Sequence, residues 1–420
     1  MLLGFDLAKT FFSPLFRASS YASMNPPIFR FRRTSWLTRW QQLAPRPALA
    51  AFASFRQNTP WPRARSHDLI ARPIQTRQSP LKDTVYNPVQ VAVIAGSAAV
   101  TGSRILPSEE VDRAFGMPAG KLRNRAGIES LAYVTDQENE LTLGAQAAQV
   151  ALRTASCAPH QLDWIVATSE THHDYPALSA QLHSLLLVRE NCGALDVGGA
   201  CLGLLNALAV AQSLIASGQA QVVAVVTADV HSRTLIPSRV AGEFGGLFGD
   251  GASAFVLRSA ADGEPGAGYR LGEFLFGCAG QYAAAIQVSD SKDGGLAVQF
   301  DGEALSRAAI TRMEKTITAI ELRSGIPRTS VGAFATHQPN PRLVTLLAKQ
   351  CGVSPDTFPP IARTSGNLGS STCGAALHAA LQDAAKLARG ERKPIFLASL
   401  GPGLLFGGGW LSPVPSRNDS

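Results

Sequence analysis

Cysteine is sparse in this chain, and no two cysteines form a CxxC pair. Six cysteines are spread widely over 420 residues. Zinc centres and thiol redox motifs need closely spaced cysteines, and small disulfide scaffolds need a much higher density of them. The pattern therefore argues against a zinc, redox or disulfide-stabilised protein. It fits a reducing compartment, which is the cytoplasm or, if the N-terminal region directs import, an organelle matrix.

A long uninterrupted apolar run is also absent. A membrane-spanning helix needs about 20 consecutive, predominantly apolar residues. The leading stretch from Leu2 to Phe16 is apolar in places, but Asp6 and Lys9 interrupt it. We therefore expect no membrane span and no secretory signal core.

Acidic residues are scarce only in the first 88 residues. This region holds eleven Arg and two Lys against three Asp, a net charge of +10. The whole chain carries +7, so residues 89–420 carry +7 minus +10, or −3. The folded part is thus mildly acidic, and nothing indicates a nucleic-acid partner. Residues 1–88 resemble a transit peptide in being Arg-rich and acid-poor. The alternative is a disordered leader or an over-long reading frame, and in either case we expect a basic, disordered extension.

Regular secondary-structure patterns begin at Val89, and an apolar share of 45% is ample for a large core. The alternation of strands and helices predicts an α/β fold of two similar halves, with helices packed on a mixed sheet. In the first half we expect strands at 91–96, 162–168, 193–200, 222–226 and 252–257, and helices at 141–154, 179–188 and 201–218. In the second half we expect strands at 269–276, 333–336, 395–400 and 404–410, and helices at 304–323, 343–350 and 373–388.

Cys201 stands where a strand pattern gives way to a helix pattern. The small-residue run GALDVGGA (193–200) predicts a short buried strand, and the apolar spacing after Cys201 is helical. A cysteine at this junction lies in the first turn of a helix, where free backbone N–H groups and the helix dipole favour the thiolate. We interpret Cys201 as a nucleophile rather than as the small buried hydrophobe that a free cysteine often is.

His337 and Asn367 lie in turn-rich segments, ATHQPN (335–340) and SGNLGSS (365–371). A lone His or Asn in a loop is more often a turn residue. Together with Cys201, however, they complete the set needed for acyl transfer through a thioester. A neutral imidazole N–H and a carboxamide N–H₂ are donors suited to stabilising an enolate. The adjacent His172 and His173 have no carboxylate or cysteine partner nearby, so we predict no metal site.

Five motifs in this order make the chain recognisable. They are ACLG (200–203), LFGDGA (247–252), HQPN (337–340), GN (366–367) and GPG (401–403). Over residues 90–412 the chain resembles the β-ketoacyl-acyl carrier protein synthase III family of the thiolase-like superfamily. The FGDG stretch is best interpreted as a tight structural turn near the active site.

The resemblance implies a thiolase-like five-layer αβαβα sandwich of two similar halves, assembled as a homodimer. Residues 89–262 would form the half with the nucleophilic cysteine and residues 263–412 the half with His and Asn. Residues 413–420 would be a tail. The substrates would be acyl-coenzyme A and malonyl thioesters, carried by coenzyme A or by acyl carrier protein, and no metal or redox cofactor is expected.

The resemblance also assigns binding residues. Arg125 and, more loosely, Arg239 match positions that contact coenzyme A, and Arg342 matches one that meets the acyl carrier protein. Tyr175 matches an aromatic residue that crosses the dimer interface to line the partner's acyl pocket. Asn340 of the HQPN motif is a further candidate, and the active-site loop consists of Gly401, Pro402 and Gly403.

The chain departs from the family at two of these places. Lys121 stands where the family often has a tryptophan that stacks on adenine, so the resemblance implies either weaker coenzyme A binding or a carrier-protein donor. Pro402 stands where a backbone N–H of the family helps to form the oxyanion hole, and proline has no N–H. The GPGL run (401–404) instead resembles the loop of type III polyketide synthases.

The sequence therefore predicts a β-ketoacyl synthase III-like acyltransferase of fatty acid or polyketide-type biosynthesis. Cys201 would accept the acyl group, and His337 and Asn367 would support decarboxylative Claisen condensation with a malonyl thioester. One alternative is an acyltransferase of secondary metabolism that delivers the acyl group to an alcohol or amine. Another is a non-catalytic partner subunit of a heterodimeric synthase, although an intact Cys-His-Asn set argues against it.

Overall fold

A computed structural model of the chain describes residues 90–261, 268–284, 286–290, 296–300 and 302–414. The basic extension expected at 1–88 lies outside these residues. So do the expected boundary between the two halves at 262/263 and most of the tail. No helix in the described ranges is long and apolar enough to cross a membrane.

Nine strands of the described residues form one hydrogen-bonded mixed sheet in the order β11-β12-β13-β8-β1-β7-β6-β4-β5. Parallel pairs join β4 to β5, β4 to β6 and β11 to β12, and the other neighbours are antiparallel. The strands are β1 (Gln90–Thr101), β4 (Trp164–Thr168), β5 (Gly193–Asp196), β6 (Val222–Val230), β7 (Asp250–Ala261), β8 (Tyr269–Cys278), β11 (Ala333–Thr336), β12 (Ile395–Gly401) and β13 (Leu405–Pro413).

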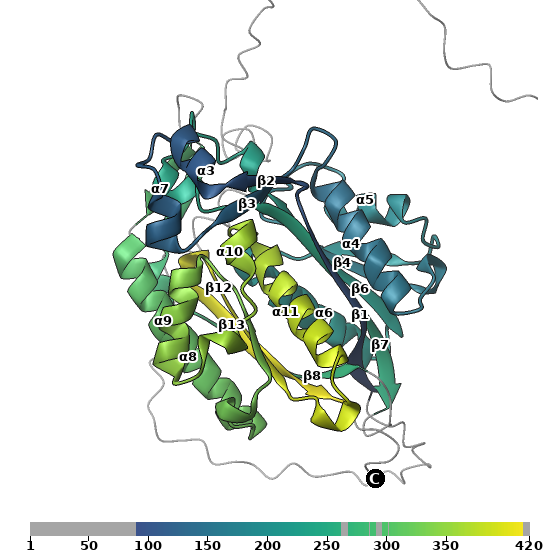
Figure 1. Cartoon of the computed structure of the whole chain (residues 1–420). Helices are drawn as coiled ribbons and strands as arrows, with labels where there is room; N and C mark the ends of the chain where they lie inside the picture. Colours follow the sequence, from purple (N-terminus) through teal and green to yellow (C-terminus); the bar gives the residue numbers. More distant parts are fainter. Residues whose placement is uncertain (1–89, 262–267, 285, 291–295, 301, 415–420) are drawn as a thin grey trace, which may run out of the picture. The chain divides into compact units, whose positions relative to one another are not determined.

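The sheet is continuous only through a narrow junction. β1 meets β8 at two residue pairs, Val93 with Arg270 and Ile94 with Tyr269. On either side of this junction the strands diverge, so that they form two layers with helices between them (Figure 1).

Helices α6 (Gly203–Ala216) and α11 (Ser370–Ala385) fill the space between the two strand layers. Their apolar side chains share one buried cluster with strands of both layers, for example Leu204 with Val225 of β6 and Leu397 of β12. Apolar burial at roughly 25 cal/mol per Å² makes such a two-sided contact a main source of stability.

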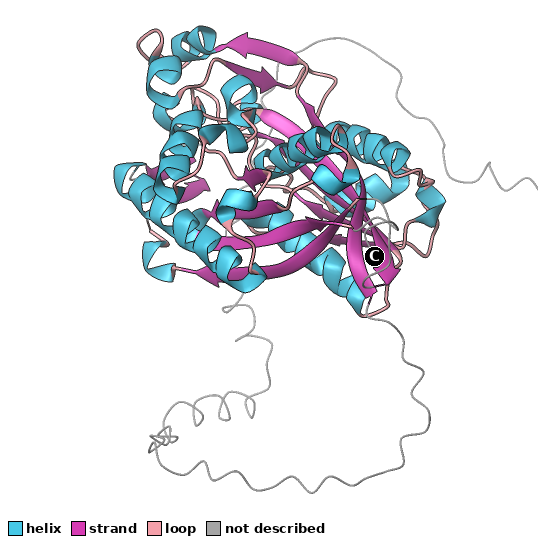
Figure 2. Ribbon diagram, turned by 60° about the horizontal axis from the view of Figure 1, so that its bottom comes forward, coloured by secondary structure: helices cyan, strands magenta, loops and turns pink. Residues whose placement is uncertain are grey.

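Two further pairs of helices cover the outer faces. α4 (Glu140–Thr154) and α5 (Leu178–Leu185) pack on β4, β6 and β7, and α8 (Gly302–Ser324) and α9 (Pro341–Cys351) pack on β11 and β12. Figures 1 and 2 show helices outside the strands as well as between them. The predicted five-layer αβαβα sandwich is confirmed.

Several short elements were not predicted, because each is too short to show a sequence period. They include an antiparallel pair of short strands, β2 (Arg104–Pro107) and β3 (Ser130–Tyr133), helices α3 (Ser108–Ala114), α7 (Gly242–Gly245) and α10 (Ile361–Ser365), and a π-helical turn at Leu122–Ala126. A second antiparallel pair joins β9 (Ile286–Asp290) to β10 (Leu296–Phe300).

The prediction of a buried strand over 193–200 was wrong in two respects. The strand β5 ends at Asp196, and most of its residues are exposed because β5 is the edge strand of the sheet. Asp196 instead caps α5, since its carboxylate accepts hydrogen bonds from the backbone N–H groups of Leu178 and Ser179 at 2.9 and 2.8 Å. Gly198 and Gly199 then turn the chain toward Cys201.

The buried aromatic group of the second half provides a test of this packing. Phe334 on β11 is fully buried, stacks on Phe358 at 4.9 Å between ring centroids and meets Phe396 edge-on at 5.8 Å. We expect Phe334→Ala to lower the free energy of unfolding by about 3–5 kcal/mol, because it removes these contacts and leaves a cavity. Denaturant titration of the full chain measures the loss. Leu322→Ala on α8 is the matched control, because its side chain is 79% exposed. Equal losses in the two variants would contradict the packing described here.

Candidate active site

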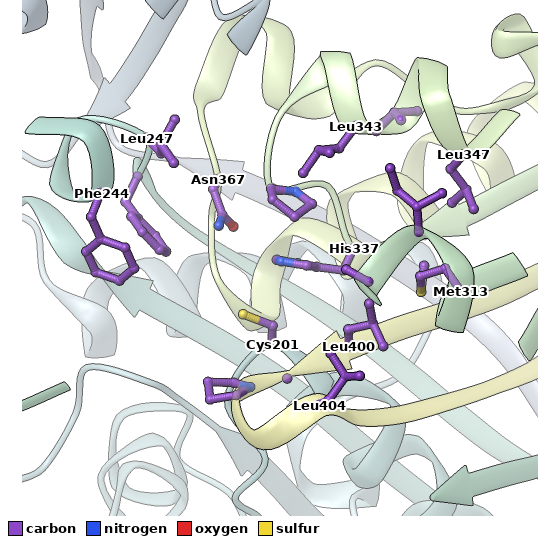
Figure 3. Close-up of a pocket in the computed structure, with 17 residues that line it drawn as sticks. Cys201, Phe244, Leu247, Met313, His337, Leu343, Leu347, Asn367, Leu400 and Leu404 are labelled. Carbon is purple, nitrogen blue, oxygen red and sulfur yellow. The ribbon is translucent and has the colours of Figure 1, made fainter. Parts of the chain in front are cut away.

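Cys201, His337 and Asn367 come from three distant parts of the chain and line one cavity of about 160 Å³. Cys201 lies in the turn before α6, His337 follows β11, and Asn367 lies between α10 and α11. Their polar ends face a common space (Figure 3). The rest of the lining is almost wholly apolar: Phe244, Leu247, Phe248, Ala309, Ile310, Met313, Pro339, Leu343, Val344, Leu347, Leu400, Gly401, Pro402 and Leu404.

The turn that carries Cys201 is strained and tightly held. Ala200 has a φ of +48°, which is unfavourable for a residue with a Cβ and persists only where the surroundings enforce it. The Cys201 carbonyl accepts a hydrogen bond from the Ser399 hydroxyl of β12 at 2.6 Å. Gly203 packs so closely on β4 that a Cβ there would lie 2.3 Å from Thr168 Oγ1. The nucleophile position is therefore fixed by both strand layers.

Asn367 is held by the LFGDGA segment through its backbone. Its N–H donates to the Leu247 carbonyl, and its carbonyl accepts from the Gly249 N–H, both at 2.9 Å. The Asn367 side-chain Oδ1 accepts hydrogen bonds from the Gly369 N–H at 3.0 Å and from the Thr372 hydroxyl at 3.1 Å. With Oδ1 satisfied in this way, the Nδ2 amide is left to face the cavity. The predicted scaffold role of the FGDG stretch is confirmed.

His337 is buried and neutral. Its backbone N–H donates to the Ala398 carbonyl at 3.1 Å, which ties the residue to β12. Burial lowers the pKa of His337 to about 4, against the opposing charge of Glu170. At neutral pH the imidazole is thus a neutral donor, as the sequence-based interpretation required.

The expectation that the helix terminus makes Cys201 a thiolate is wrong. Burial raises the pKa of Cys201 well above its ordinary value, and the nearby Glu170 carboxylate raises it further. Cys201 rests as a thiol.

Three buried titratable residues near Cys201 were not predicted. Glu170 follows β4 and His231 follows β6, and their side chains approach to 3.4 Å between Oε2 and Nε2. Asp229, at the end of β6, accepts hydrogen bonds from the Glu170 N–H and the Ser370 hydroxyl, both at 2.6 Å. Their position could have predicted them. β4 and β6 are parallel neighbours, and charged residues lie at the carboxyl ends of both strands.

The predicted binding residues lie outside the cavity lining. Arg125 and Arg342 are exposed on adjacent elements, since a Cβ on Gly127 would lie 3.7 Å from the Arg342 backbone nitrogen. Tyr175 is 95% exposed, and Arg239 is half-buried. The Asn340 side chain caps α9, accepting from the Leu343 N–H at 3.0 Å.

Lys121 and Pro402, the two departures from the family pattern, both lie within the described structure. Lys121 forms an ion pair with Glu243 of α7. Gly401 and Pro402 line the cavity, whereas Gly403 does not. Gly401 packs against the nucleophile turn, where a Cβ would lie 2.8 Å from the Gly199 carbonyl oxygen.

Among the described residues, no three histidine, cysteine or carboxylate side chains converge as metal ligands would.

The raised pKa of Cys201 predicts slow alkylation. At about pH 8, near the ordinary pKa of a thiol, iodoacetamide should modify the exposed Cys278 well before Cys201. The rate at Cys201 should keep rising above that pH, because the thiolate forms only there. Peptide mass spectrometry resolves the two sites, and Cys201→Ala identifies the Cys201 signal. Rapid Cys201 labelling that is already constant below neutral pH would contradict the assignment of a resting thiol.

Known proteins of one family match the chain in sequence and in structure. Residues 195–280 match the family model of 3-oxoacyl-[acyl-carrier-protein] synthase III, and residues 322–412 match its C-terminal part. The β-ketoacyl-[acyl-carrier-protein] synthase III of Dinoroseobacter shibae is 29% identical over 325 residues, which cover 75% of this chain and 97% of the relative.

Solved structures agree with this result. The 3-oxoacyl-(acyl carrier protein) synthase III of Pseudomonas aeruginosa superposes with a TM-score of 0.68 at 26% identity, over 77% of this chain and all of that one. OleA of Xanthomonas campestris, solved with lauric acid and lauroyl-CoA, has the same fold, with a TM-score of 0.69 at 21% identity over 77% of this chain and 99% of that one. In sequence and in fold the chain is thus similar to the 3-oxoacyl-[acyl-carrier-protein] synthase III family, as a divergent, synthase III-like protein with the thiolase-type fold.

Proposed function

We propose that this protein is an acyltransferase that joins an acyl group to a malonyl unit by decarboxylative Claisen condensation. The observation that carries the proposal is the meeting of Cys201, His337 and Asn367 in one apolar cavity. A thiol nucleophile and two neutral donors are the groups that this two-step reaction needs.

In the first step the Cys201 sulfur attacks the carbonyl carbon of an acyl thioester. The substrate's carbon–sulfur bond then breaks, coenzyme A or the carrier-protein thiol leaves, and the acyl group stays on Cys201. Pro402 has no N–H to offer the oxyanion. We therefore assign the main donor for the oxyanion to the Cys201 amide at the start of the turn.

In the second step a malonyl thioester loses CO₂. The electrons of the broken carbon–carbon bond form an enolate, whose oxygen receives hydrogen bonds from the His337 imidazole and the Asn367 amide. The enolate carbon attacks the acyl-Cys201 carbonyl and releases the sulfur. A neutral His337 suits this step, because its N–H can donate to the enolate oxygen while the imidazole adds no charge to the apolar cavity. These two reaction steps need no metal or redox cofactor.

The apolar wall of the cavity favours an acyl chain over a charged substrate. Side chains of α8 and α9, such as Met313 and Leu347, form much of this wall. The OleA structure with lauric acid and lauroyl-CoA shows that the fold can hold long acyl groups in a relative. Arg125 and Arg342, adjacent and exposed, are suited to the phosphates of coenzyme A or of a carrier-protein arm.

A homodimer is part of this proposal. The edge strand β5 has no partner on its outer side among the described residues. Exposed apolar side chains lie on and near it, including Tyr175, Leu187 and Leu195, which are 95%, 84% and 36% exposed. An unpaired edge with apolar neighbours is a surface that another chain can extend.

The acyl-enzyme is the first intermediate to test. We expect the full-length chain, incubated with a panel of acyl-coenzyme A thioesters, to gain one acyl mass that Cys201→Ala abolishes. Malonyl-coenzyme A should then discharge the adduct with release of CO₂. An adduct that an alcohol or amine discharges, and malonyl-coenzyme A does not, would favour the alternative acyltransferase. No adduct with either coenzyme A or carrier-protein donors, and only heteromeric assembly, would favour a non-catalytic subunit.

The second step is tested by removing its donors. His337→Ala and Asn367→Ala should each slow CO₂ release from malonyl thioester by about 10²–10³-fold, the usual cost of losing one oxyanion donor. Both variants should still become acylated at Cys201, because their donors serve the enolate. Gln338→Ala is a neighbouring control that removes hydrogen bonds to Pro359 and Ala362 but no donor in the cavity. Unchanged CO₂ release in both donor variants would refute the assigned roles.

A further inference from the structure

The Glu170 carboxylate is buried beside the Cys201 thiol, and the mechanism above does not use it. The Glu170 side chain is 14% exposed. Its Oε2 faces His231, whereas its Oε1 is buried and has no hydrogen-bond partner of good geometry in the described part of the chain. The carboxylate and the thiol nevertheless interact directly, and each shifts the pKa of the other. A buried carboxylate oxygen without a full partner is costly, so its retention here calls for an explanation.

His231 is arranged to carry a positive charge. Its Nδ1 lies 3.3 Å from the Gly249 carbonyl oxygen, and its Nε2 lies 3.4 Å from Glu170 Oε2. Both neighbours are acceptors, and only the imidazolium has N–H groups at both nitrogens. Burial alone would lower the pKa of His231, but the carboxylates of Glu170, Asp229 and Asp250 together outweigh it and raise the pKa to about 9.

Close packing from two sides supports the Glu170–His231 pair. Gly369 packs against both members, because a Cβ there would lie 2.6 Å from His231 Cε1 and 3.0 Å from the Glu170 carboxyl carbon. The His231 ring also packs on Phe248, 4.6 Å between centroids. Burial would raise the pKa of Glu170, but His231 reverses that effect and keeps the carboxylate ionised.

The other titratable groups that act on the pair include two carboxylates and a neutral imidazole. Asp229 and Asp250 both act on His231 and support its charge, and His337 acts on Glu170. Burial raises the pKa of Asp229 to about 6, so this carboxylate shares in the titration of the cluster at mildly acidic pH.

We propose that Glu170 is a further catalytic residue, which takes the proton of the Cys201 thiol as the sulfur attacks the acyl thioester. The S–H bond of Cys201 breaks, an O–H bond forms on Glu170, and a carbon–sulfur bond forms to the acyl group. When the substrate's own carbon–sulfur bond breaks, Glu170 returns the proton to the departing thiolate. Thiol and thioester simply exchange partners, and no oxidant or reductant is involved. This inference rests on the proposed acylation of Cys201.

The charges favour Glu170 over His337 as the base. If Glu170 takes the proton, the buried site holds one positive charge on His231 and one negative charge on the oxyanion. If His337 took it, a second imidazolium would form near His231 while Glu170 stayed ionised. Extra charges in a site of low dielectric are expensive, and His231 already opposes the protonation of His337.

Glu170→Gln in the full-length chain separates this role from a purely electrostatic one. We expect Cys201 acylation by acyl-coenzyme A to slow by about 10²–10⁴-fold, the usual contribution of a general base. We expect alkylation of the same thiol by iodoacetamide to become faster, because loss of the negative charge lowers the pKa of Cys201. Glu170→Asp keeps the charge, so its alkylation should stay slow and its acylation should recover in part. Peptide mass spectrometry follows both reactions at Cys201.

Each other outcome overturns the inference. If acylation and alkylation of Cys201 both become faster in Glu170→Gln, Glu170 only suppresses the thiolate. If neither rate changes, Glu170 does not act on Cys201. If both fall together with the melting temperature, its role is structural. If the wild-type chain is not acylated by any donor, the proposed function itself fails. If the wild-type chain is acylated normally, the proposed function stands and the variants test only the role of Glu170.

His231→Gln provides an independent measurement if Glu170→Gln does not fold. Without the imidazolium, burial raises the pKa of Glu170, so the carboxylate protonates at higher pH. The acid limb of the acylation rate should therefore move to higher pH, with little change in the rate at alkaline pH. An unchanged pH profile would overturn the inference.

Discussion

Burial of α6 and α11 between two strand layers is the constraint on which the site depends. Both helices begin at the same end of the molecule, so the turn with Cys201 and the turn with Asn367 meet there. The carboxyl ends of β4, β6, β11 and β12 deliver the remaining site residues to the same place. Close approach of helix and sheet requires small residues, since a Cβ on Gly374 of α11 would lie 1.9 Å from Ser253 Oγ of β7. The same packing that stabilises the fold thus aligns the reactive groups.

Two histidines of the site are held in opposite protonation states by their neighbours. His337 has no buried anion as a direct partner, so desolvation dominates and lowers its pKa to about 4. His231 faces a carboxylate and a carbonyl oxygen, and its pKa rises to about 9. One imidazole is therefore a neutral donor toward the cavity, and the other is a fixed cation behind the nucleophile. Burial is common to both, and hydrogen-bond partners decide the difference.

The fold of the chain is shared with its relatives, whereas Lys121 and Pro402 stand at positions where the resemblance leads us to expect other residues. The layers of the sandwich superpose on synthase III and OleA structures at TM-scores of 0.68 and 0.69. Lys121, where the resemblance leads us to expect an aromatic ring, is instead paired with Glu243. In the proposed mechanism Pro402 has no N–H to offer beside Cys201, so acylation would depend more on the groups that remain. A buried carboxylate beside the thiol is consistent with such a site.

The sequence by itself determined the layered α/β class and the trio of Cys201, His337 and Asn367. Strand and helix periods are local properties of the sequence, and the order of the motifs can be recognised without knowing which residues are in contact. Tertiary structure decided the protonation state of Cys201, because burial and the charge of Glu170 raise the pKa of its thiol. It also decided that β5 is an exposed edge and that Glu170, 61 residues before His231, is its ion-pair partner. Desolvation and long-range pairing depend on which segments pack together, and no local pattern records that.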